Sequence, residues 1–434
     1  MQKIARIPTP EKKRIVIVGG GFAGLKLARN CARKDVQVVL IDRNNYHQFQ
    51  PLFYQVATAG LEPSSISFPL RKIFHKSDDV HFRMARLEEV DLQQQLIHTN
   101  LGYLDYDYLV LATGVSTNYF GLENVKKNAV PMKSVSEAIY LRNRILENYE
   151  KALNETDEEQ QQALMNIVIV GGGPTGVELA GALAEMKKYI LPKDYPELDF
   201  SKMQIYLFEA GDRLLQGMLE KSGAEAYGSL KKMGVNVYLN QPVEDYDGEL
   251  VKTSGGENFR SKTLIWTAGV TGRSIKGLPE DVLTRNKRIH VDQYNRIKGY
   301  KNAFAIGDIA YMETSEYPQG HPQVAQVAIQ QAEHLSKNLV RYNRGQDMKL
   351  FFYEDRGAMA TIGRNRAVAD LPLTHLKGFP AWILWLFVHL MAIVGVKNRF
   401  FIFINWMWNY LTYDQSLRVL IRPKLFRYSK LVEE

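Results

Sequence analysis

Cysteine is almost absent from this sequence, because Cys31 is the single cysteine among 434 residues. One thiol cannot form a disulfide within the chain, a Cys-x-x-Cys redox pair or a thiolate cluster around zinc. The sequence also offers too few ligands for an iron–sulfur cluster. We therefore expect no metal centre and no dithiol chemistry.

The N-terminal segment lacks the apolar stretch of a secretory signal. The segment 1–14 is short and mostly polar, and the apolar run Ile15-Val16-Ile17-Val18 follows it directly. Hydrophobic residues make up 45% of the chain and charged residues 24%, a balance that excludes wholesale disorder. The length predicts two or three domains. The net charge of +8 raises the possibility of an acidic partner: a nucleic acid, a membrane surface or a polyanionic ligand.

An internal repeat is the strongest organisational feature of the sequence. Residues 14–24 read RIVIVGGGFAG, and residues 166–176 read NIVIVGGGPTG. In each copy an apolar run, typical of a strand buried on both faces of a parallel sheet, leads through a glycine-rich turn into a helix-forming stretch. A second pair of similar runs follows, YLVLATG at 108–114 and LIWTAG at 264–269. We expect an α/β fold with two Rossmann-like dinucleotide-binding domains.

The first glycine-rich turn has the spacing of a phosphate-binding loop. Its glycines permit a tight turn, close approach of the backbone to a pyrophosphate and close packing of helix on strand. The residues are Gly19, Gly21 and Gly24. Asp42, at the end of the next predicted strand, is placed to bind the ribose hydroxyls.

The second turn repeats this design with Gly171, Gly173 and Gly176. Its acidic residue is Glu209, at the end of the run Gln204–Phe208. A carboxylate there binds the ribose 2′-hydroxyl and repels a 2′-phosphate, which favours NADH. Arg213 lies nearby and leaves NADPH as an alternative.

Two dinucleotide-binding folds in one chain suggest FAD in one and a nicotinamide nucleotide in the other. The architecture resembles the two-dinucleotide-binding flavoprotein superfamily, in which the first loop takes FAD and the second NAD(P)H. The run Ala303-Phe304-Ala305-Ile306-Gly307-Asp308 matches a further element of that superfamily, in which the aspartate, here Asp308, binds the flavin ribityl chain. The single cysteine excludes the disulfide reductases and the sulfide:quinone oxidoreductases of the superfamily.

Four motifs narrow the resemblance. They are HPQVAQVAIQQAEH at 321–334, NYHQFQPLFYQVATAG at 45–60, GGGPTGVE at 171–178 and ATIGR at 360–364. With them the whole chain resembles the type II NADH dehydrogenases, the single-subunit NADH:quinone oxidoreductases. The resemblance implies non-covalent FAD, oxidation of NADH and reduction of a membrane quinone without proton pumping.

The resemblance also assigns roles to individual residues. Gln326 and Gln330 share one helix face, which in the family meets the quinone. Glu178 is expected near the nicotinamide and the flavin, where it is a candidate proton donor. Lys397 is expected near flavin and quinone, with a lipid headgroup as the alternative partner. Further cofactor-binding positions are Arg43, Leu87, Ala112, Ala328 and Ile329.

The C-terminal part changes character. Residues 378–396 contain no Asp, Glu, Lys or Arg, a second aromatic stretch follows, and four of the five tryptophans lie between 382 and 408. Tryptophan and tyrosine favour the membrane–water interface, and apolar segments with basic flanks lie in its plane. We expect residues 379–434 to attach monotopically to a bilayer, on the cytoplasmic face of a bacterial inner membrane, rather than to span it. A dimer interface or an internal core remains an alternative, and attachment does not exclude a homodimer.

The charge distribution supports a membrane surface and argues against nucleic acid. Residues 397–434 hold seven Lys or Arg and three Asp or Glu, so this tail carries +4, half of the total excess. The predicted domains are an FAD-binding domain in two parts, 1–125 and 281–350, an NADH-binding domain at 126–280 and a C-terminal membrane-attachment domain at 351–434.

Two other functions remain open from sequence. One is a soluble NAD(P)H-dependent flavin reductase that passes electrons to a protein such as ferredoxin. The other is a non-enzymatic flavoprotein that senses nucleotides or binds nucleic acid, which only the overall charge suggests.

Overall fold

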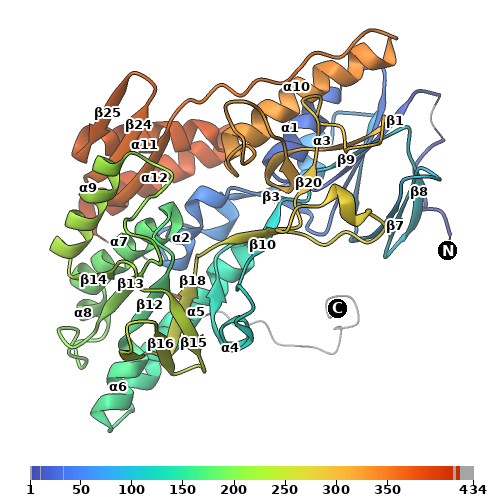
Figure 1. Ribbon diagram of the computed structural model, residues 1–434. Helices are drawn as coiled ribbons and strands as arrows, with labels where there is room; N and C mark the ends of the chain where they lie inside the picture. The colour runs from blue at the N-terminus through green and yellow to red at the C-terminus, as the bar shows by residue number, and fades with distance from the viewer. Residues whose placement is uncertain (1, 10, 33, 414–416, 421–434) are drawn as a thin grey trace. The chain divides into compact units, whose positions relative to one another are not determined.

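The computed structural model describes residues 2–9, 11–32, 34–413 and 417–420 (Figure 1). The chain divides into two compact units. The first unit takes its described residues from Met1–Phe49, Ser67–Asn118 and Gly269–Gly357, and the second from Gln50–Ile66, Tyr119–Ala268 and Ala358–Glu434. The domain bounds expected from sequence stay a prediction.

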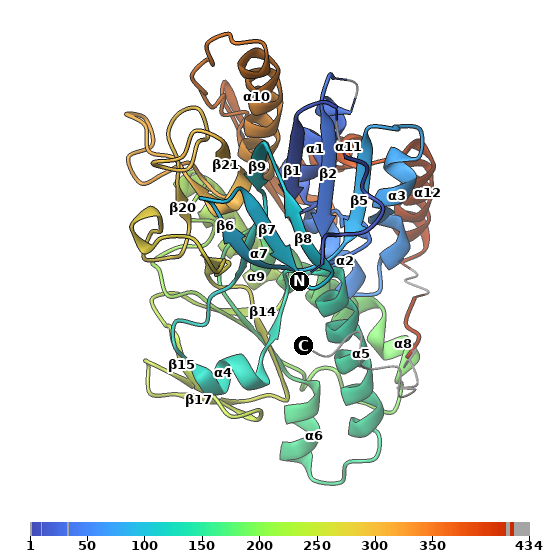
Figure 2. The same cartoon turned by 90° about the vertical axis from the view of Figure 1, so that its right-hand side faces the viewer.

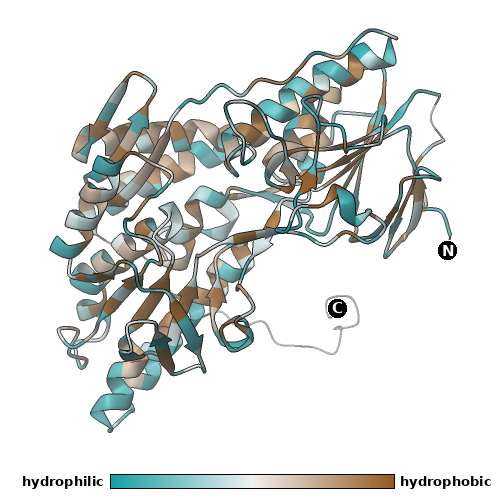
Figure 3. Cartoon of the chain, viewed as in Figure 1, coloured by the Kyte–Doolittle hydropathy of each residue, from teal (hydrophilic) through white to brown (hydrophobic). Residues whose placement is uncertain are grey.

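A parallel five-stranded sheet forms the centre of the first unit, in the order β21-β9-β1-β2-β5. Its strands are β1 (Arg14–Val18), β2 (Gln37–Asp42), β5 (Val80–Met84), β9 (Tyr108–Leu111) and β21 (Ala303–Ala305). Every residue of β1 is buried, as expected for a strand covered on both faces. Figure 2 shows β9, β1, β2 and β5 side by side, and Figure 3 shows how apolar the sheet strands are.

Two helices of the first unit pack against each other, α1 (Phe22–Cys31) and α10 (Ala325–Asn343). An antiparallel sheet is formed by β6 (Leu87–Asp91), β7 (Leu96–Thr99) and β8 (Gly102–Asp105). The shorter elements are β3 (Tyr46–Gln48), β4 (Ser67–Pro69), α3 (Leu70–Phe74), β10 (Val115–Thr117), β19 (Val270–Gly272), η3 (Glu280–Val282), β20 (Ile289–His290), η4 (Gly307–Ile309) and β22 (Ala310–Tyr311).

The second unit repeats the parallel sheet, in the order β11-β18-β12-β13-β14. Its strands are β11 (Val130–Pro131), β12 (Ile167–Val170), β13 (Ile205–Phe208), β14 (Val235–Tyr238) and β18 (Thr263–Trp266). The helices around it are α4 (Glu123–Asn128), α5 (Val135–Ala152), α6 (Glu158–Met165), α7 (Pro174–Tyr189), α8 (Leu191–Asp194) and α9 (Glu220–Lys232). A small antiparallel sheet contains β15 (Val243–Tyr246), β16 (Leu250–Thr253) and β17 (Asn258–Arg260). The two Rossmann-like sheets predicted from the repeat are thus confirmed.

The C-terminal part of the second unit begins with an antiparallel sheet that the sequence analysis did not predict. Its strands are β23 (Ala358–Gly363), β24 (Arg366–Leu371) and β25 (Thr374–Lys377). Helices α11 (Gly378–Ala392) and α12 (Val396–Thr412) follow. Three short elements of an earlier segment belong to the same unit, η1 (Gln50–Leu52), α2 (Phe53–Ala57) and η2 (Pro63–Ser65).

The apolar segment 379–396 does not form one helix, because α11 ends at Ala392 and α12 starts after Gly395, whose φ is +90°. Within the described residues, no helix is both long and apolar enough to cross a bilayer. The basic residues Arg422, Lys424, Arg427 and Lys430 of the expected flank lie outside the described residues.

Candidate functional site

The first glycine loop is closely packed where the sequence predicts it. Gly19 has a φ of +110°, and a Cβ on it would overlap the carbonyl oxygen of Ala112. A Cβ on Gly24 would overlap the Gly19 carbonyl oxygen, so only glycine lets α1 start this close to β1. Gly21 faces open space. The loop therefore leaves its backbone accessible at the one position where a pyrophosphate needs it.

Asp42 holds this loop from the end of β2. One carboxylate oxygen accepts a hydrogen bond from the amide of Gly20 at 2.6 Å, and the other from the amide of Asn44 at 2.7 Å. Burial raises the pKa of Asp42, and the two amide donors oppose that rise. Since a carboxylate oxygen can accept two hydrogen bonds, both oxygens keep capacity for ribose hydroxyls.

Asp308 lies in η4, and three side chains that the sequence analysis missed fix its backbone. Gln331, buried on α10, accepts a hydrogen bond from the amide of Gly307 at 2.7 Å. Arg288 and Gln323 each donate to the carbonyl oxygen of Asp308 at 3.1 Å. Gly307 has a φ of +74° and packs between the two helices, since a Cβ on it would lie 3.2 Å from Ala23 on α1 and 3.4 Å from Ala328 on α10. The arrangement holds Asp308 beside the first loop, as a residue that contacts a flavin nucleotide requires.

The second loop reproduces the first. Gly171 has a φ of +108°, and a Cβ on it would lie 2.7 Å from the amide nitrogen of Ala268. A Cβ on Gly176 would overlap the Gly171 carbonyl oxygen, while Gly173 faces open space. The repeat in the sequence is therefore a repeat in backbone geometry, and both loops fit a dinucleotide.

Glu209 takes the place of Asp42 in the second unit. Its carboxylate accepts hydrogen bonds from the amides of Gly172 at 2.6 Å and Gly211 at 2.8 Å. Arg213 does not extend from the loop as a free cation, because its guanidinium donates to the carbonyl oxygens of Met218 and Gln216. This engagement weakens the NADPH alternative.

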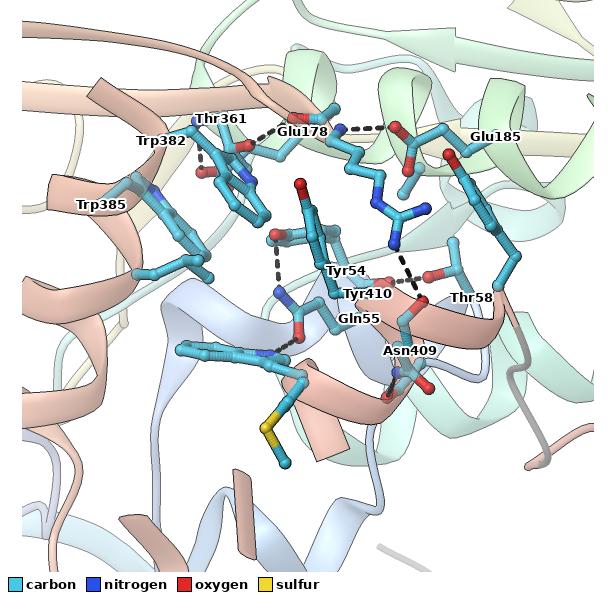
Figure 4. A pocket seen from close by; sticks show the side chains of 18 of the residues that line it. Tyr54, Gln55, Thr58, Glu178, Glu185, Thr361, Trp382, Trp385, Asn409 and Tyr410 are labelled. Atoms are coloured by element: carbon cyan, nitrogen blue, oxygen red, sulfur yellow. Dashed lines mark hydrogen bonds between the residues drawn. The ribbon is translucent and has the colours of Figure 1, made fainter. Parts of the chain in front are cut away.

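A cavity of about 490 Å³ lies within the second unit, between α2, α7, β23, α11 and α12 (Figure 4). We call it the aromatic cavity. Helix α7 lines it with Glu178, Ala182, Glu185 and Tyr189, which recur on one helix face. Gly181, which the sequence analysis did not single out, permits this geometry, because a Cβ on it would overlap the carbonyl oxygen of Ile362 in β23.

Glu178 lies at the wall of the aromatic cavity with 8% of its surface exposed. Burial raises its pKa from 4.5 to about 8, against the opposing effects of the Thr361 amide and the Trp385 side chain. The Thr361 amide donates to the carboxyl oxygen at 3.4 Å. A carboxyl group with this pKa is mostly protonated at neutral pH and can supply a proton to a bound molecule.

A chain of hydrogen bonds on the opposite wall was also missed. The Trp406 indole donates to Gln55 Oε1 at 2.7 Å, and Gln55 Nε2 donates to the Tyr54 hydroxyl at 2.8 Å. The 45–60 motif contains Tyr54 and Gln55, yet the sequence could not connect them to α12, because that contact depends on the fold.

Arg364 closes another side of the cavity. Its guanidinium lies 4.2 Å from the ring centroid of Tyr410 and 3.7 Å from that of Tyr413. It donates to the carbonyl oxygen of Asn409 at 3.3 Å, and its amide donates to Glu185 at 2.5 Å. The side chain thereby attaches the end of α12 to β23 and α7.

The remaining predicted residues are placed as follows. Gln326 and Gln330 lie on α10, but the Gln330 amide bonds both the carbonyl oxygen and the amide of Glu354, at 2.9 and 3.0 Å. Lys397 is exposed at the start of α12, with its ammonium 5.6 Å from the Phe401 ring centroid. Arg43 is exposed, Leu87 and Ile329 are half-buried, and Ala112 and Ala328 are buried.

Cys31 is fully buried in α1, and burial raises the pKa of its thiol to about 12. A protonated, inaccessible thiol is neither a nucleophile nor a redox centre. Within the described ranges, no group of three or more His, Cys, Asp or Glu side chains could hold a metal ion.

Two family models match this chain, and solved structures share its fold. A family model described as pyridine nucleotide-disulphide oxidoreductase matches residues 13–332, and one described as NDH2 C-terminal domain matches residues 356–413. Among solved structures, NDH2 from Plasmodium falciparum in complex with NADH has a TM-score of 0.86 at 22% identity, covering 95% of this chain and 100% of that one. The sulfide:quinone oxidoreductase from Aquifex aeolicus shares the fold with a TM-score of 0.73 at 20% identity, covering 89% of this chain and 92% of that one.

The names of the sequence relatives are more specific than those of the family models. The chain is 34% identical to the type II NADH:quinone oxidoreductase Ndh of Mycobacterium tuberculosis, over 97% of this chain and 93% of that protein. It is 29% identical to the type II NADH:quinone oxidoreductase of Haemophilus influenzae, over 83% of this chain and 87% of that protein. The chain belongs to the type II NADH:quinone oxidoreductase family.

Proposed function

We propose specific roles for the two loops and the aromatic cavity in this chain, an FAD-dependent NADH:quinone oxidoreductase. The first loop and Asp42 bind FAD, the second loop and Glu209 bind NADH, and the aromatic cavity binds the quinone. Bound FAD supplies the chemistry of accepting a hydride from NADH and passing two electrons to the quinone. The observation that carries the assignment of the quinone is a buried carboxyl group, Glu178, whose pKa is raised to about 8, in a mostly apolar cavity lined by the aromatic helices α11 and α12.

The first loop fits a dinucleotide because two of its glycines are closely packed and the third is open. Asp308, with its backbone fixed by Arg288, Gln323 and Gln331, would hold the ribityl chain. Arg43, Leu87, Ala112, Ala328 and Ile329 complete the proposed FAD contacts.

The second loop selects NADH. Glu209 is held by two loop amides, so its charge is fixed beside the open position at Gly173. A 2′-phosphate would meet this carboxylate, whereas a 2′-hydroxyl would donate to it.

The mouth of the aromatic cavity is suited to a lipid-soluble quinone. Its outer wall contains Ile383, Phe387, Phe403 and Met407 from α11 and α12, all of which are exposed. A quinone has an apolar tail and a ring whose carbonyl groups only accept hydrogen bonds. Glu178, protonated at neutral pH, can deliver a proton to such an oxygen.

The quinone contacts inferred from the family extend this site. Gln326, Gln330 and Lys397 stay proposed contacts. The bonds between Gln330 and the Glu354 backbone give that glutamine a positioning role as well, since they tie α10 to the segment that leads into β23.

Helices α11 and α12 would attach the protein to a bilayer. Each presents an exposed apolar stripe at helical spacing, Phe379, Ile383, Phe387 and Met391 on α11, and Phe400, Ile404, Met407 and Leu411 on α12. Stripes of this kind bury in the membrane interface. A monotopic position on the cytoplasmic face of a bacterial inner membrane agrees with entry of quinone from the lipid, and such attachment is compatible with a homodimer.

Anaerobic stopped-flow measurement tests the proposal. NADH should bleach the flavin absorbance, and a quinone analogue should restore it. Bulk placed in the cavity by Ala182→Phe should leave bleaching by NADH intact and slow the recovery with quinone at least about 10-fold. Recovery at the native rate in this variant would contradict the assignment of the cavity.

A further inference from the structure

The inner end of the aromatic cavity contains an indole without a hydrogen-bond partner. Trp385 on α11 is 1% exposed and lines the cavity, and its Nε1 has no hydrogen-bond partner among the described residues. The N–H lies close enough to Glu178 to lower the pKa of that carboxyl group, but the two groups do not meet the geometric criteria of a hydrogen bond. A buried donor left unpaired costs about 1–3 kcal/mol, which a bound acceptor would offset.

A second donor that lines the cavity is the hydroxyl group of Tyr54 on α2. An indole can only donate, so Trp406 fixes the oxygen of Gln55 toward itself and the nitrogen toward Tyr54. The Tyr54 hydroxyl oxygen therefore accepts from Gln55, and its own hydrogen is left to donate. No described residue accepts that hydrogen.

Neighbouring rings hold the two donors in place. The ring centroids of Tyr54 and Trp385 are 6.3 Å apart. Trp385 stacks on His389 with centroids 4.0 Å apart, and Trp406 lies 6.1 Å away. Figure 4 shows Tyr54 and Trp385 bordering the same space. Most of the residues that line the cavity are aromatic or aliphatic, and Glu178 is one of its few ionisable residues.

The charge state of this end of the cavity is neutral near pH 7. Burial raises the pKa of Tyr54 well above 10, and it raises the pKa of Glu178 to about 8. The titratable groups here are thus uncharged at neutral pH and can donate, which suits a planar molecule with acceptor oxygens.

We propose that Trp385 Nε1–H and Tyr54 O–H donate hydrogen bonds to a ring carbonyl oxygen of the quinone and so orient it for reduction. The inference rests on the proposed role of the aromatic cavity as the quinone site. In the overall reaction NADH, one proton and quinone give NAD⁺ and quinol. The two donors transfer no proton themselves; they stabilise the negative charge that develops on the oxygen before it is protonated.

Two conservative variants test the donors. Trp385→Phe and Tyr54→Phe each remove one N–H or O–H and keep an aromatic ring. Each should raise the KM for a short-chain quinone about 3- to 10-fold, the loss expected for one neutral hydrogen bond. Reduction of ferricyanide by NADH, which needs no quinone site, should be unchanged. Tyr140→Phe, at an exposed tyrosine of α5, is the matched control.

An infrared measurement distinguishes hydrogen bonding from packing. The carbonyl stretch of ¹³C-labelled quinone bound to the native protein should lie below that of the free quinone, and each variant should shift it upward. An unshifted band and native KM values in both variants would overturn the proposal. If Trp385→Phe does not fold, the Tyr54→Phe variant and the carbonyl band of quinone in the native complex still test the proposal.

Ala182→Phe separates this inference from the proposed function. If it blocks quinone reduction while both donor variants behave as native, the cavity is the quinone site and the donor pair is wrong. If quinone reduction persists in Ala182→Phe, the site itself is misassigned, and the donor pair is overturned with it.

Discussion

Strand β23 crosses helix α7 so closely that a side chain on Gly181 would overlap the carbonyl oxygen of Ile362. This contact sets the spacing between Glu178 and Thr361, which face each other across it. The glycine is thus a structural requirement of the cavity rather than a consequence of helix formation, since glycine disfavours a helix interior.

Gly181→Ala should therefore destabilise the protein despite the better helix propensity of alanine. Overpacking against a backbone oxygen costs about 1–3 kcal/mol, and quinone reduction should fall more than ferricyanide reduction. Gly228→Ala is the matched control, because Gly228 lies inside α9 with no atom within 4 Å of the added Cβ. That change should be neutral or stabilise by up to about 1 kcal/mol. Equal midpoints of urea unfolding for both variants would refute the packing argument.

The pKa of Glu178 predicts the pH dependence of quinone reduction. The carboxyl group is protonated below about pH 8 and loses its proton above it, so the rate should fall as pH rises through 8. Glu178→Gln keeps the volume but cannot ionise, and should lower turnover roughly 100-fold and remove this fall. Glu244→Gln, at an exposed site, is the control. A native pH profile in Glu178→Gln would exclude the carboxyl group as proton donor.

The same shift predicts a stability effect of definite sign. The folded state holds the Glu178 proton up to about pH 8, whereas the unfolded chain releases it near 4.5. Between these values the folded state binds more protons, so the free energy of unfolding decreases as pH rises, by at most about 1.4 kcal/mol per pH unit. In Glu178→Gln this contribution should vanish, so the stabilities of the variant and the native protein should diverge with pH across that window. Parallel stability curves would show that Glu178 titrates normally.

Glu209 predicts the choice of nicotinamide nucleotide. Glutamine in its place keeps one acceptor oxygen but turns an amide group toward the other loop amide, and it removes the charge that repels a 2′-phosphate. Glu209→Gln should lower the ratio of kcat/KM for NADH to that for NADPH by about 10- to 100-fold. Glu257→Gln, exposed in the same unit, should leave the ratio unchanged. If Glu209→Gln discriminated between NADH and NADPH as the native protein does, Glu209 would not be the residue that selects the nucleotide.

The cofactor loops were predictable from sequence because their chemistry is local. Glycine spacing, a preceding apolar strand and an acid at the end of the next strand all lie in short segments, and the structure repeats them in both units. The aromatic cavity was not predictable in this way. Tyr54 and Trp385 are more than 300 residues apart, and the β23–β25 sheet that joins them to Glu178 has no strong alternation in sequence.

The prediction for Gln330 was limited in the same way, because the sequence indicated its helix but not its hydrogen-bond partners. Helical spacing correctly placed Gln326 and Gln330 on one helix, α10. It could not show that the Gln330 amide is engaged by the backbone of Glu354, nor that its neighbour Gln331 would be the buried residue that holds Gly307. Periodicity predicts a face, whereas hydrogen-bond partners depend on segments distant in the chain.

The exposed stripe on α12 predicts how the protein binds lipid. Phe400 and Leu411 are 60% and 71% exposed, are eleven residues apart and therefore lie on one helix face, and do not line the aromatic cavity. The double variant Phe400→Ser, Leu411→Ser should reduce co-sedimentation with anionic phospholipid vesicles at least about 10-fold, since burial of each side chain contributes roughly 1–2 kcal/mol. Phe352→Ser is the control, because Phe352 is 77% exposed but lies in the first unit, away from α11 and α12 in sequence. Ferricyanide reduction should be native in both. Equal loss of vesicle binding in the control would mean that general surface hydrophobicity, rather than the α12 stripe, drives the attachment.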